Sequence, residues 1–416
     1  MVRRPYVPRI ADALVERLLA DFPAIMLLGP RASGKTTTAL RFAKTVFRLD
    51  RPADAAAILL DPDVVLADAV PPILIDEWQL IPSGLGAVKR AVDEDSTPGR
   101  FILAGSARSD ELASGWPATG RLIRVAQWGL SQRELAKKVS APSFFDIAFS
   151  GNLSTLVAPD KPLDLRDYIE AALVGGFPEA ALHASASHRA HWLKSYVKQL
   201  LTHDAPLLGE HRDPARLQRY LRALAANTAG VTEHKTLYDA AGVTRVTAAR
   251  YDSLLELLML TEQVAPWSSN RLSRLTRSPK RYLVDPSLLG PLLGVEPRAV
   301  LRNADLLGRL IDSFVLAQLR PEREASKISL NLYHLRHEHG LHEIDLIAEA
   351  PDGRVVAFEI KASSAPDRAA AKHLCWLRER LGQDFTAGIV FHTGPRAFLL
   401  DQRVYALPIS VLWARP

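Results

Sequence analysis

The sequence predicts an α/β protein with a parallel-sheet domain first, a helical middle, and a second α/β domain at the C-terminus. Three observations lead to this prediction. Short apolar runs alternate with helical patterns in the first third of the chain, which is typical of a parallel sheet covered by helices. Helical spacing without strands dominates residues 165–226. Alternating apolar residues, the pattern of half-buried strands, return after residue 327.

The size and composition of the chain are those of a globular protein. Its 416 residues exceed one ordinary core, so about two or three domains are expected. Hydrophobic residues make up 48% of the chain, which excludes a disordered protein. No apolar run could cross a bilayer, and the basic N-terminus lacks the apolar core of a signal peptide. The single Cys375 excludes an intramolecular disulfide, so we expect a cytoplasmic protein without a membrane partner.

A glycine-bounded loop follows the first apolar run, residues 24–28, and leads into a helical pattern over residues 37–44. Glycines permit backbone angles that turn consecutive N–H groups inward around an anion, and the helix N-terminus adds partial positive charge. The loop matches G-x-x-x-x-G-K-[ST] in the required strand–loop–helix setting, which predicts nucleotide phosphate binding. The expected phosphate-binding residues are Gly29, Pro30, Arg31, Ala32, Ser33, Gly34, Lys35, Thr36 and Thr37.

Four side chains near this loop have expected chemical roles. Lys35 can reach the β- and γ-phosphates, and the Thr36 hydroxyl can hold Mg²⁺. A second apolar run, residues 71–75, ends in Asp76 and Glu77. We expect this run to form a neighbouring strand. Asp76 would then help to hold the Mg²⁺, directly or through water, and Glu77 would polarise the attacking water.

Three further residues have roles that the sequence leaves open. Ser106 lies near the end of the expected strand over residues 101–107, where it can sense the γ-phosphate beside Asp76 or only satisfy its own turn. Arg121 follows a glycine and can contact the transferred phosphate, in cis or from a neighbouring subunit of a homo-oligomer. It can equally be a surface arginine. Arg124 is a second candidate for the same finger role.

The other elements of the first domain, residues 1–140, agree with a three-layer arrangement. Apolar spacing predicts a helix over residues 8–21 that packs on the sheet. Residues 46–50 are expected to form a short strand. Residues 140–163 are rich in Ser, Pro and Gly, so we expect an irregular link there.

The middle of the chain divides into a helical region, residues 164–229, and a winged-helix-like domain, residues 230–300. The latter has a short helix, a turn, a longer helix capped by Thr244 with Arg245 and Arg250 on its exposed side, and two strands. The segment leading into the second strand contains Arg271, Arg274, Arg277, Lys280 and Arg281 and no acid. Such an order is typical of proteins that contact the DNA backbone and also of protein–protein modules. The net charge of +6 does not decide between them.

Residues 301–416 are expected to form a separate α/β domain, beginning with an apolar helix that carries Asp312. Alternation places Glu359 and Lys361 on one face of a strand, with Asp345 across a hairpin. This is the PD-(D/E)xK nuclease arrangement, in which Asp345 and Glu359 hold Mg²⁺ while Lys361 orients or activates water. The alternative is an edge hairpin with solvated charges. Cleavage of nucleic acid is therefore left open.

Taken together, these motifs resemble those of prokaryotic AAA+-like P-loop ATPases with a C-terminal domain of unassigned function. The resemblance covers nearly the whole chain, and the phosphate loop is its most specific part. It implies ATP rather than GTP, a restriction-endonuclease-like C-terminal fold, a sensor role for Ser106 and a candidate finger at Arg121. The other matching segments are residues 75–79 with Pro82, 103–106, 120–121, 175–179, 343–345 and 359–361.

Two positions depart from the pattern of that family. Ala32 stands where relatives often have Gln, which a loop that acts through its backbone should tolerate. Asp312 stands where the C-terminal helix often carries Glu. The shorter side chain could leave a metal site incomplete, which puts nuclease activity further in doubt.

The predicted function is that of a Mg²⁺-dependent ATPase that associates with DNA and uses ATP to rearrange its C-terminal domains. The alternative is a regulatory ATPase whose C-terminal domains bind protein partners without cleaving nucleic acid. ATP and Mg²⁺ are the expected cofactors of both. The expected partner is DNA in the first case and another protein in the second.

Overall fold

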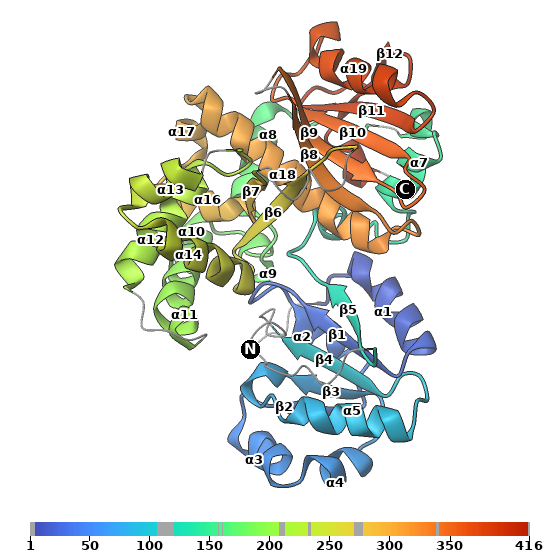
Figure 1. Ribbon diagram of the computed structural model, residues 1–416, viewed down its shortest axis with the longest axis vertical. Coiled ribbons are helices and arrows are strands. Elements are labelled where there is room, and N and C mark those ends of the chain that lie inside the picture. The colour runs from blue at the N-terminus through green and yellow to red at the C-terminus, as the bar shows by residue number, and fades with distance from the viewer. Residues whose placement is uncertain are drawn as a thin grey trace.

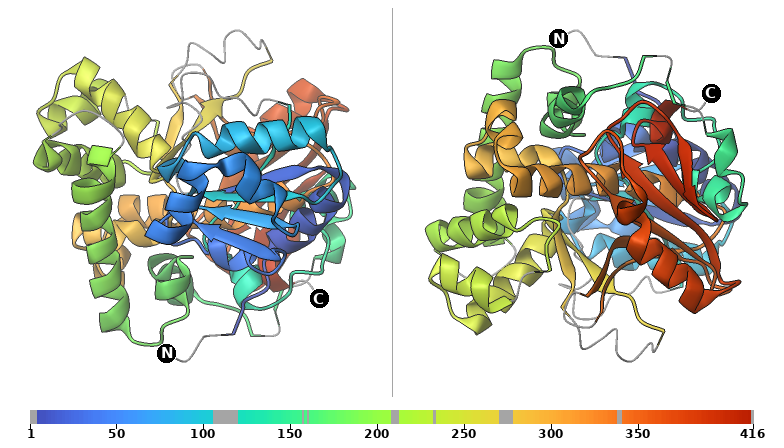
Figure 2. Two further views of the ribbon diagram at one scale, coloured as in Figure 1. Left: turned by 90° about the horizontal axis from the view of Figure 1, so that it is seen from below. Right: turned by 90° about the horizontal axis from the view of Figure 1, so that it is seen from above.

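The structure is a computed structural model with two sheet domains and a group of helices beside them (Figure 1). The sheet domains lie at opposite ends of the long axis. Viewed along that axis, the helices of the middle of the chain lie to one side of both sheets (Figure 2). The structure describes residues 5–105, 120–156, 158–159, 161–207, 213–231, 234–269, 278–337 and 341–414.

The N-terminal sheet has five parallel strands in the order β2-β3-β4-β1-β5. Strand β4 therefore separates the phosphate-loop strand β1 from the acidic strand β3, and the expectation that these two are neighbours is wrong. Both strands are parallel to β4, so their carboxyl ends still meet at one edge of the sheet. The strands are β1 (Ala24–Leu28), β2 (Thr45–Arg48), β3 (Ile73–Asp76), β4 (Phe101–Gly105) and β5 (Ile123–Ala126).

Helices cover both faces of this sheet and bury two apolar cores. One core holds Val15 of α1 with Ile25 and Leu27 of β1, and the other holds Val88 of α5 with Met26. The helix after the phosphate loop is α2 (Lys35–Ala39), shorter than the predicted helix that continues to residue 44. The other helices here are α1 (Ile10–Asp21), α3 (Pro52–Leu60), α4 (Pro62–Ala67), η1 (Trp78–Leu80) and α5 (Gly84–Glu94).

The middle of the chain is helical, as its spacing predicts. Within the described residues, no helix is both long and apolar enough to cross a bilayer. The helices are α8 (Leu165–Val174), α9 (Pro178–Ala181), α10 (Ala186–Gln199), the π-helical turn η4 (Leu200–Asp204), α11 (Ala205–Leu207), α12 (Pro214–Ala226), α13 (His234–Ala241) and α14 (Arg245–Leu257), followed by η5 (Pro286–Leu288), α16 (Leu289–Leu293) and α17 (Pro297–Leu301). The predicted cap of α14 is confirmed, because the Thr244 side chain accepts a hydrogen bond from the amide of Thr247 at 3.2 Å.

The C-terminal sheet has eight strands in the order β12-β13-β11-β10-β9-β8-β6-β7. Helix α18 (Ala304–Ala325) packs on one face, and α19 (Lys372–Leu381) packs on the other. The strands are β6 (Thr261–Pro266), β7 (Lys280–Leu283), β8 (Asn331–His337), β9 (His342–Glu349), β10 (Val355–Ile360), β11 (Phe385–His392), β12 (Phe398–Asp401) and β13 (Val404–Pro408).

The two strands expected to form a separate wing belong to this larger sheet. β6 pairs antiparallel with β7 and parallel with β8. The sequence does not reveal this pairing, because β6 and β8 are separated by residues 267–330, which include α18. As a consequence, the start of β7 faces α18 and β9 instead of solvent.

The predicted irregular link over residues 140–163 contains a helix, α7 (Phe144–Phe149). Phe144 and Phe145 are fully buried in the C-terminal core. The ring of Phe144 lies 5.7 Å from that of Phe391, and Phe145 lies 6.1 Å from Phe358. Burial of two aromatic rings stabilises the folded segment by more than the turn-forming residues around them destabilise a helix. This segment therefore becomes part of the C-terminal domain.

Helix α18 joins the N-terminal domain to the rest of the molecule. Helix α6 (Gln132–Leu135) follows β5, and its Arg133 forms a buried ion pair with Glu322 of α18 at 2.8 Å. The amide of Gln132 donates to Gln318 of the same helix at 2.7 Å. Helix α1 also contacts α18. The N-terminal domain therefore packs directly against the first helix of the C-terminal domain.

Candidate functional site

The phosphate loop lies at the sheet edge where the carboxyl ends of the parallel strands meet. Helix α2 begins at Lys35, directly after the loop. The hydroxyl of Thr36 donates to Oδ1 of Asp76 at 2.9 Å. The structure thus brings together two residues from separate segments that were both expected to hold Mg²⁺.

The backbone of the loop explains its glycines. A Cβ at Gly29 would lie 1.9 Å from the carbonyl oxygen of Gln127, so any other residue would force the loop to move. Gly34 has φ +94°, a conformation that glycine adopts without steric penalty. Ala32 has φ 60°, which costs a non-glycine residue roughly 1–2 kcal/mol. Gln at this position would meet the same cost, so tolerance of the departure to Ala32 stays a prediction.

Lys35 is turned back into the loop to which it belongs. Its Nζ donates to the carbonyl oxygens of Gly29 and Pro30, both at 2.8 Å. Burial lowers the pKa of Lys35 to about 8. The buried hydroxyl of Ser33 has no hydrogen-bond partner among the described residues. These features fit a triphosphate held by the loop and Lys35, with Mg²⁺ held by Thr36 and Asp76.

Glu77 is held in an unusual conformation directly after β3. Its φ is 54°, and its Oε2 accepts a hydrogen bond from Nε2 of Gln79. A Cβ at Gly105 would lie 2.5 Å from Oε1 of Gln79, so the glycine at the end of β4 allows this approach. Gln79 therefore orients Glu77, a role that sequence reasoning missed. The sequence signals were the place of Gln79 two positions after the acid and within the matching segment 75–79.

A cavity of about 210 Å³ adjoins the beginning of α2. Gly34 and Thr37 form one wall, the N-terminal residues Tyr6 and Val7 a second, and Pro178 of α9 a third. Thr37, predicted to bind nucleotide, thus faces a cavity between the nucleotide domain and the middle helices.

Of the candidate sensor and finger residues, the structure describes Arg121 and Arg124 but not Ser106. Arg121 precedes β5, and because β5 runs parallel to β1, it lies at the sheet edge opposite the phosphate loop. It forms an exposed ion pair with Asp93 at 2.8 Å. The proposed role in cis conflicts with this position, whereas a role toward a neighbouring subunit stays a prediction for Arg121 and for the exposed Arg124.

Two of the middle helices contact the phosphate loop through Arg31. The guanidinium of Arg31 pairs with Asp204 of η4 at 3.0 Å. The Tyr196 hydroxyl of α10 donates to the carbonyl oxygen of Arg31 at 3.1 Å. From the other side, Nη1 of Arg9 donates to the carbonyl oxygen of Ser33 at 2.9 Å. Sequence reasoning missed Tyr196 and Asp204, because no local pattern links them to a loop more than 160 positions earlier.

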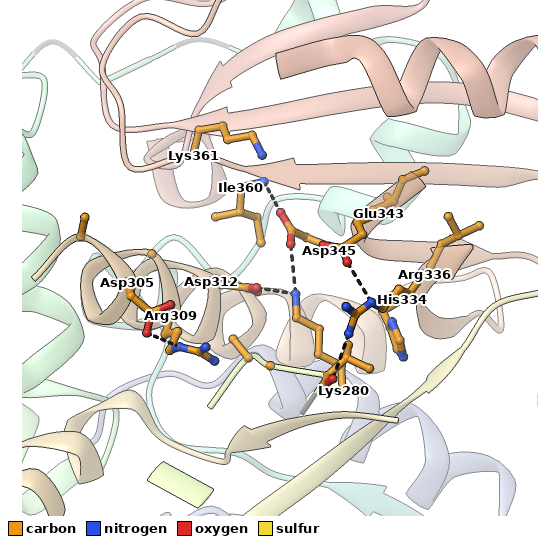
Figure 3. Close-up of a pocket in the computed structure, with 17 residues that line it drawn as sticks. Lys280, Asp305, Arg309, Asp312, His334, Arg336, Glu343, Asp345, Ile360 and Lys361 are labelled. Atoms are coloured by element: carbon orange, nitrogen blue, oxygen red, sulfur yellow. Dashed lines mark hydrogen bonds and ion pairs between the residues drawn. The ribbon is translucent and has the colours of Figure 1, made fainter. Parts of the chain in front are cut away.

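A second candidate site lies between α18 and the C-terminal sheet. Asp345 directly precedes Leu346 and Glu359 directly follows Phe358. Because Leu346 and Phe358 are paired in the antiparallel ladder of β9 and β10, the two acids lie across from each other. Lys361 Nζ donates to Oε2 of Glu359 at 2.7 Å. A cavity of about 490 Å³ opens beside them and is lined by Asp312, Asp345 and Lys361 (Figure 3).

Lys280 also reaches this cavity, where sequence reasoning did not expect it. It was assigned to a solvent-exposed basic wing, but it starts β7 and is 5% exposed. Its Nζ lies 2.5 Å from Oδ2 of Asp312 and 3.1 Å from Oδ1 of Asp345 (Figure 3). Arg281 is partly buried against Asp252 at 3.8 Å. The other wing arginines, Arg271, Arg274 and Arg277, lie outside the described residues.

Burial and the neighbouring charges shift the pKa values of the groups in this cluster. Burial would lower the pKa of Lys280, but Asp312 and Asp345 raise it well above its ordinary value. Burial would raise the pKa of Asp345, but Lys280 and Lys361 lower it. Burial, together with the charge of Asp345, raises the pKa of Glu359 to about 8.

The predicted Mg²⁺ site of Asp345 and Glu359 does not fit this arrangement. The structure has no group of three or more His, Cys, Asp or Glu residues in its described parts that could hold a metal ion. The oxygens that Mg²⁺ would need already accept hydrogen bonds from lysines and from the backbone. Glu359 Oε1 is the exception, because it is buried without a partner among the described residues.

Comparison with known proteins agrees with the geometry of the phosphate loop. An AAA domain matches residues 21–136, and two domains of unknown function match residues 165–299 (DUF8612) and 307–412 (DUF4143). The uncharacterized proteins Rv2008c of Mycobacterium tuberculosis and Mb2031c of Mycobacterium bovis are each 31% identical over 405 residues, which cover 96% of this chain and 83% of the relative. The chain belongs to this family of AAA-domain proteins.

The AAA domain supports a P-loop ATPase in general, and the DUF4143 domain matches the C-terminal part of the chain. The Walker-type ATPase PABY2304 of Pyrococcus abyssi is also similar, with 14% identity and a TM-score of 0.42. That similarity covers 70% of this chain and 97% of the archaeal protein. The fold assignment depends on the strand order of the N-terminal sheet and not on this weak likeness.

The buried carboxyl of Glu359 predicts a pH-dependent stability. Because its pKa is raised from 4.5 to about 8 in the folded protein, folding favours the protonated form. This stabilisation is complete below the unfolded-state pKa of 4.5 and is lost as the pH rises to about 8. Glu359→Gln cannot ionise, so its thermal midpoint should rise relative to that of the wild type across this range. Calorimetry that finds the same difference at every pH would contradict the prediction.

Proposed function

We propose that this protein is a Mg²⁺-dependent ATPase that transmits the state of its nucleotide site to the middle helices. The observation that carries the proposal is the position of Arg31 within the phosphate loop. Its guanidinium pairs with Asp204, and its carbonyl accepts from Tyr196. A phosphate group entering the loop would change the conformation or the charge balance around Arg31. Both contacts to the middle helices would then change.

The residues at the loop suit the chemistry of ATP hydrolysis. Lys35 would leave the carbonyls of its own loop to contact the β- and γ-phosphates. Thr36 and Asp76 would hold Mg²⁺, which supplies charge neutralisation at the phosphates. Glu77, oriented by Gln79, would accept a hydrogen bond from the attacking water.

The cavity beside α2 could hold the base of the nucleotide. Its volume of about 210 Å³ is large enough for a purine base, and it opens from Gly34, where the phosphates would begin. Part of its wall is Pro178 of α9, so a base in this cavity would contact the middle helices as well as the loop. This gives the nucleotide a second contact with the middle helices, through α9 and not through α10 and η4.

Substitutions at Glu77 and Lys35 test ATP hydrolysis. Glu77→Gln should retain ATP binding and lower the rate of phosphate release by about 10²–10⁴-fold, because the general base is lost. Lys35→Ala should lose ATP binding itself. Equilibrium binding of ATP and steady-state phosphate release would distinguish the two. Hydrolysis at the wild-type rate in Glu77→Gln would contradict the assignment of Glu77.

Substitutions at the loop–helix contact test the transmission. ATP binding to wild-type protein should change hydrogen exchange in residues 186–204, which include α10 and η4. The double variant Tyr196→Phe/Asp204→Ala should still bind ATP but lose this change, because both contacts to Arg31 are removed. Gln199→Ala, also on α10 but bonded to Ser195, is the matched control. Unchanged exchange in the wild type would show that the helices do not sense the nucleotide.

DNA association is a second candidate function, favoured by α14. This helix follows α13 across a turn in which Gly242 has φ 65°. Arg245 and Arg250 both lie on its exposed side, beside the exposed Val246. An exposed second helix with two arginines is suited to contact phosphates. Lys280 and Arg281 add little to such a surface, since the first is buried in the C-terminal cluster.

Removal of these arginines tests DNA association. Arg245→Ala/Arg250→Ala should weaken binding to duplex DNA and reduce the slope of log affinity against log salt by about one for each lost phosphate contact. Arg219→Ala/Arg222→Ala on α12, also exposed, removes the same charge elsewhere and serves as the control. Wild-type protein that fails to bind DNA even at low salt would instead favour the regulatory alternative, with a protein as the partner.

A further inference from the structure

A buried lysine occupies the centre of the C-terminal carboxylate cluster. Lys280 enters from β7, Asp312 from α18 and Asp345 from β9 (Figure 3). The ammonium lies 2.5 Å from one carboxylate and 3.1 Å from the other. In a metal-dependent nuclease, such a position between two carboxylates is where a divalent cation neutralises their charge.

The remaining oxygens of the two carboxylates are also occupied. Oδ1 of Asp312 accepts from the Tyr282 hydroxyl at 3.0 Å. Oδ2 of Asp345 accepts from the amide of Ile360 at 2.9 Å. Mg²⁺ takes close to six oxygen ligands at short range, several of them usually water and one or two of them carboxylates. To enter here, it would have to displace a buried ammonium that pairs with both acids.

We propose that the ammonium of Lys280 takes the place of a metal ion between Asp312 and Asp345, so that the C-terminal site is neutralised from within and excludes divalent cations. Lys280 is then an internal counter-ion that ties β7 to α18 and β9. The domain keeps the shape of the cluster without the cation that phosphodiester cleavage would need. Its cavity is a binding surface and not a cutting site.

The charges around the cavity agree with this assignment. Arg309 pairs with Asp305 at 2.8 Å, and Arg336 pairs with Glu343 at 2.9 Å. Four of the basic and acidic residues that line the cavity therefore balance one another in pairs. A nuclease cleft would instead be expected to offer excess positive charge to the phosphate backbone. The proposal does not depend on the ATPase function, because it concerns only the C-terminal site.

Manganese binding to full-length protein without nucleotide tests the proposal. Wild-type protein and the Asp345→Asn variant should bind the same number of Mn²⁺ ions, because the C-terminal cluster of the wild type should hold none. Any Mn²⁺ held by Thr36 and Asp76 would persist in that variant and so would not be confused with the C-terminal site. Lys280→Met should gain a Mn²⁺ site, and Lys280→Met/Asp345→Asn should lose it again. Electron paramagnetic resonance titration of free Mn²⁺ measures each case.

Two controls make the outcome decisive. Lys361→Met removes a cation from the same cavity but leaves Lys280 in place, so it should gain no Mn²⁺ site. If Lys280→Met is unstable, Mn²⁺ should raise its thermal midpoint by more than it raises that of the wild type, because both proteins share any site at Thr36 and Asp76. Three results would overturn the proposal: an Asp345-dependent Mn²⁺ site in the wild type, an equal gain in Lys361→Met, or a folded Lys280→Met without any gain. If Lys280→Met does not fold with or without Mn²⁺, the comparison of wild type with Asp345→Asn decides alone.

Discussion

Buried charges along α18 constrain how the parts of this molecule fit together. A charge removed from water must be paired, because an unpaired one would destabilise the fold by several kcal/mol. The partners of three such charges come from α6, β6 and β7, segments far apart in the chain. The pairs are Arg133–Glu322, Glu262–Arg320 and Lys280–Asp312. The nucleotide domain and the β6–β7 hairpin can therefore take only the places where their charges meet this helix.

That constraint gives the phosphate loop its surroundings. Because α1 and α6 are held against α18, the loop faces the middle helices, and Arg31 comes within reach of Tyr196 and Asp204. The loop is thus bounded on one side by its own sheet and on the other by helices from a different part of the chain. A nucleotide site between two such bodies can act on both, which is the basis of the proposed transmission.

The two candidate sites contrast in how cations are handled. At the phosphate loop, Thr36 and Asp76 contact each other and Lys35 donates to two backbone carbonyls, an arrangement that suits the proposed binding of a triphosphate with its metal. At the C-terminal cluster, Lys280 already satisfies both acids. The same residue types, a lysine and carboxylates, thus support nucleotide chemistry in one place and an internal ion cluster in the other.

The phosphate loop, the acidic strand and the helical middle could all be recognised from sequence, because their signals are local: fixed spacing, an apolar run ending in acids, and helical periodicity. Even Asp345, Glu359 and Lys361 follow from the alternation along two strands. The residues that sequence reasoning missed or misplaced act over long range. Lys280 looked like one of several basic wing residues, and Phe144 lay in a segment whose composition predicts a loop.

The sequence by itself determined the chemistry that each segment could offer, since this depends on residue type and on neighbours within a few positions. The tertiary structure alone decided which of those groups meet. It placed β4 between β1 and β3 while leaving Asp76 beside Thr36, and it turned Lys280 inward because β7 joins the C-terminal sheet. The physical reason is that contacts between distant segments are stabilised by burial. No pattern along the chain indicates which distant partner a buried charge will have.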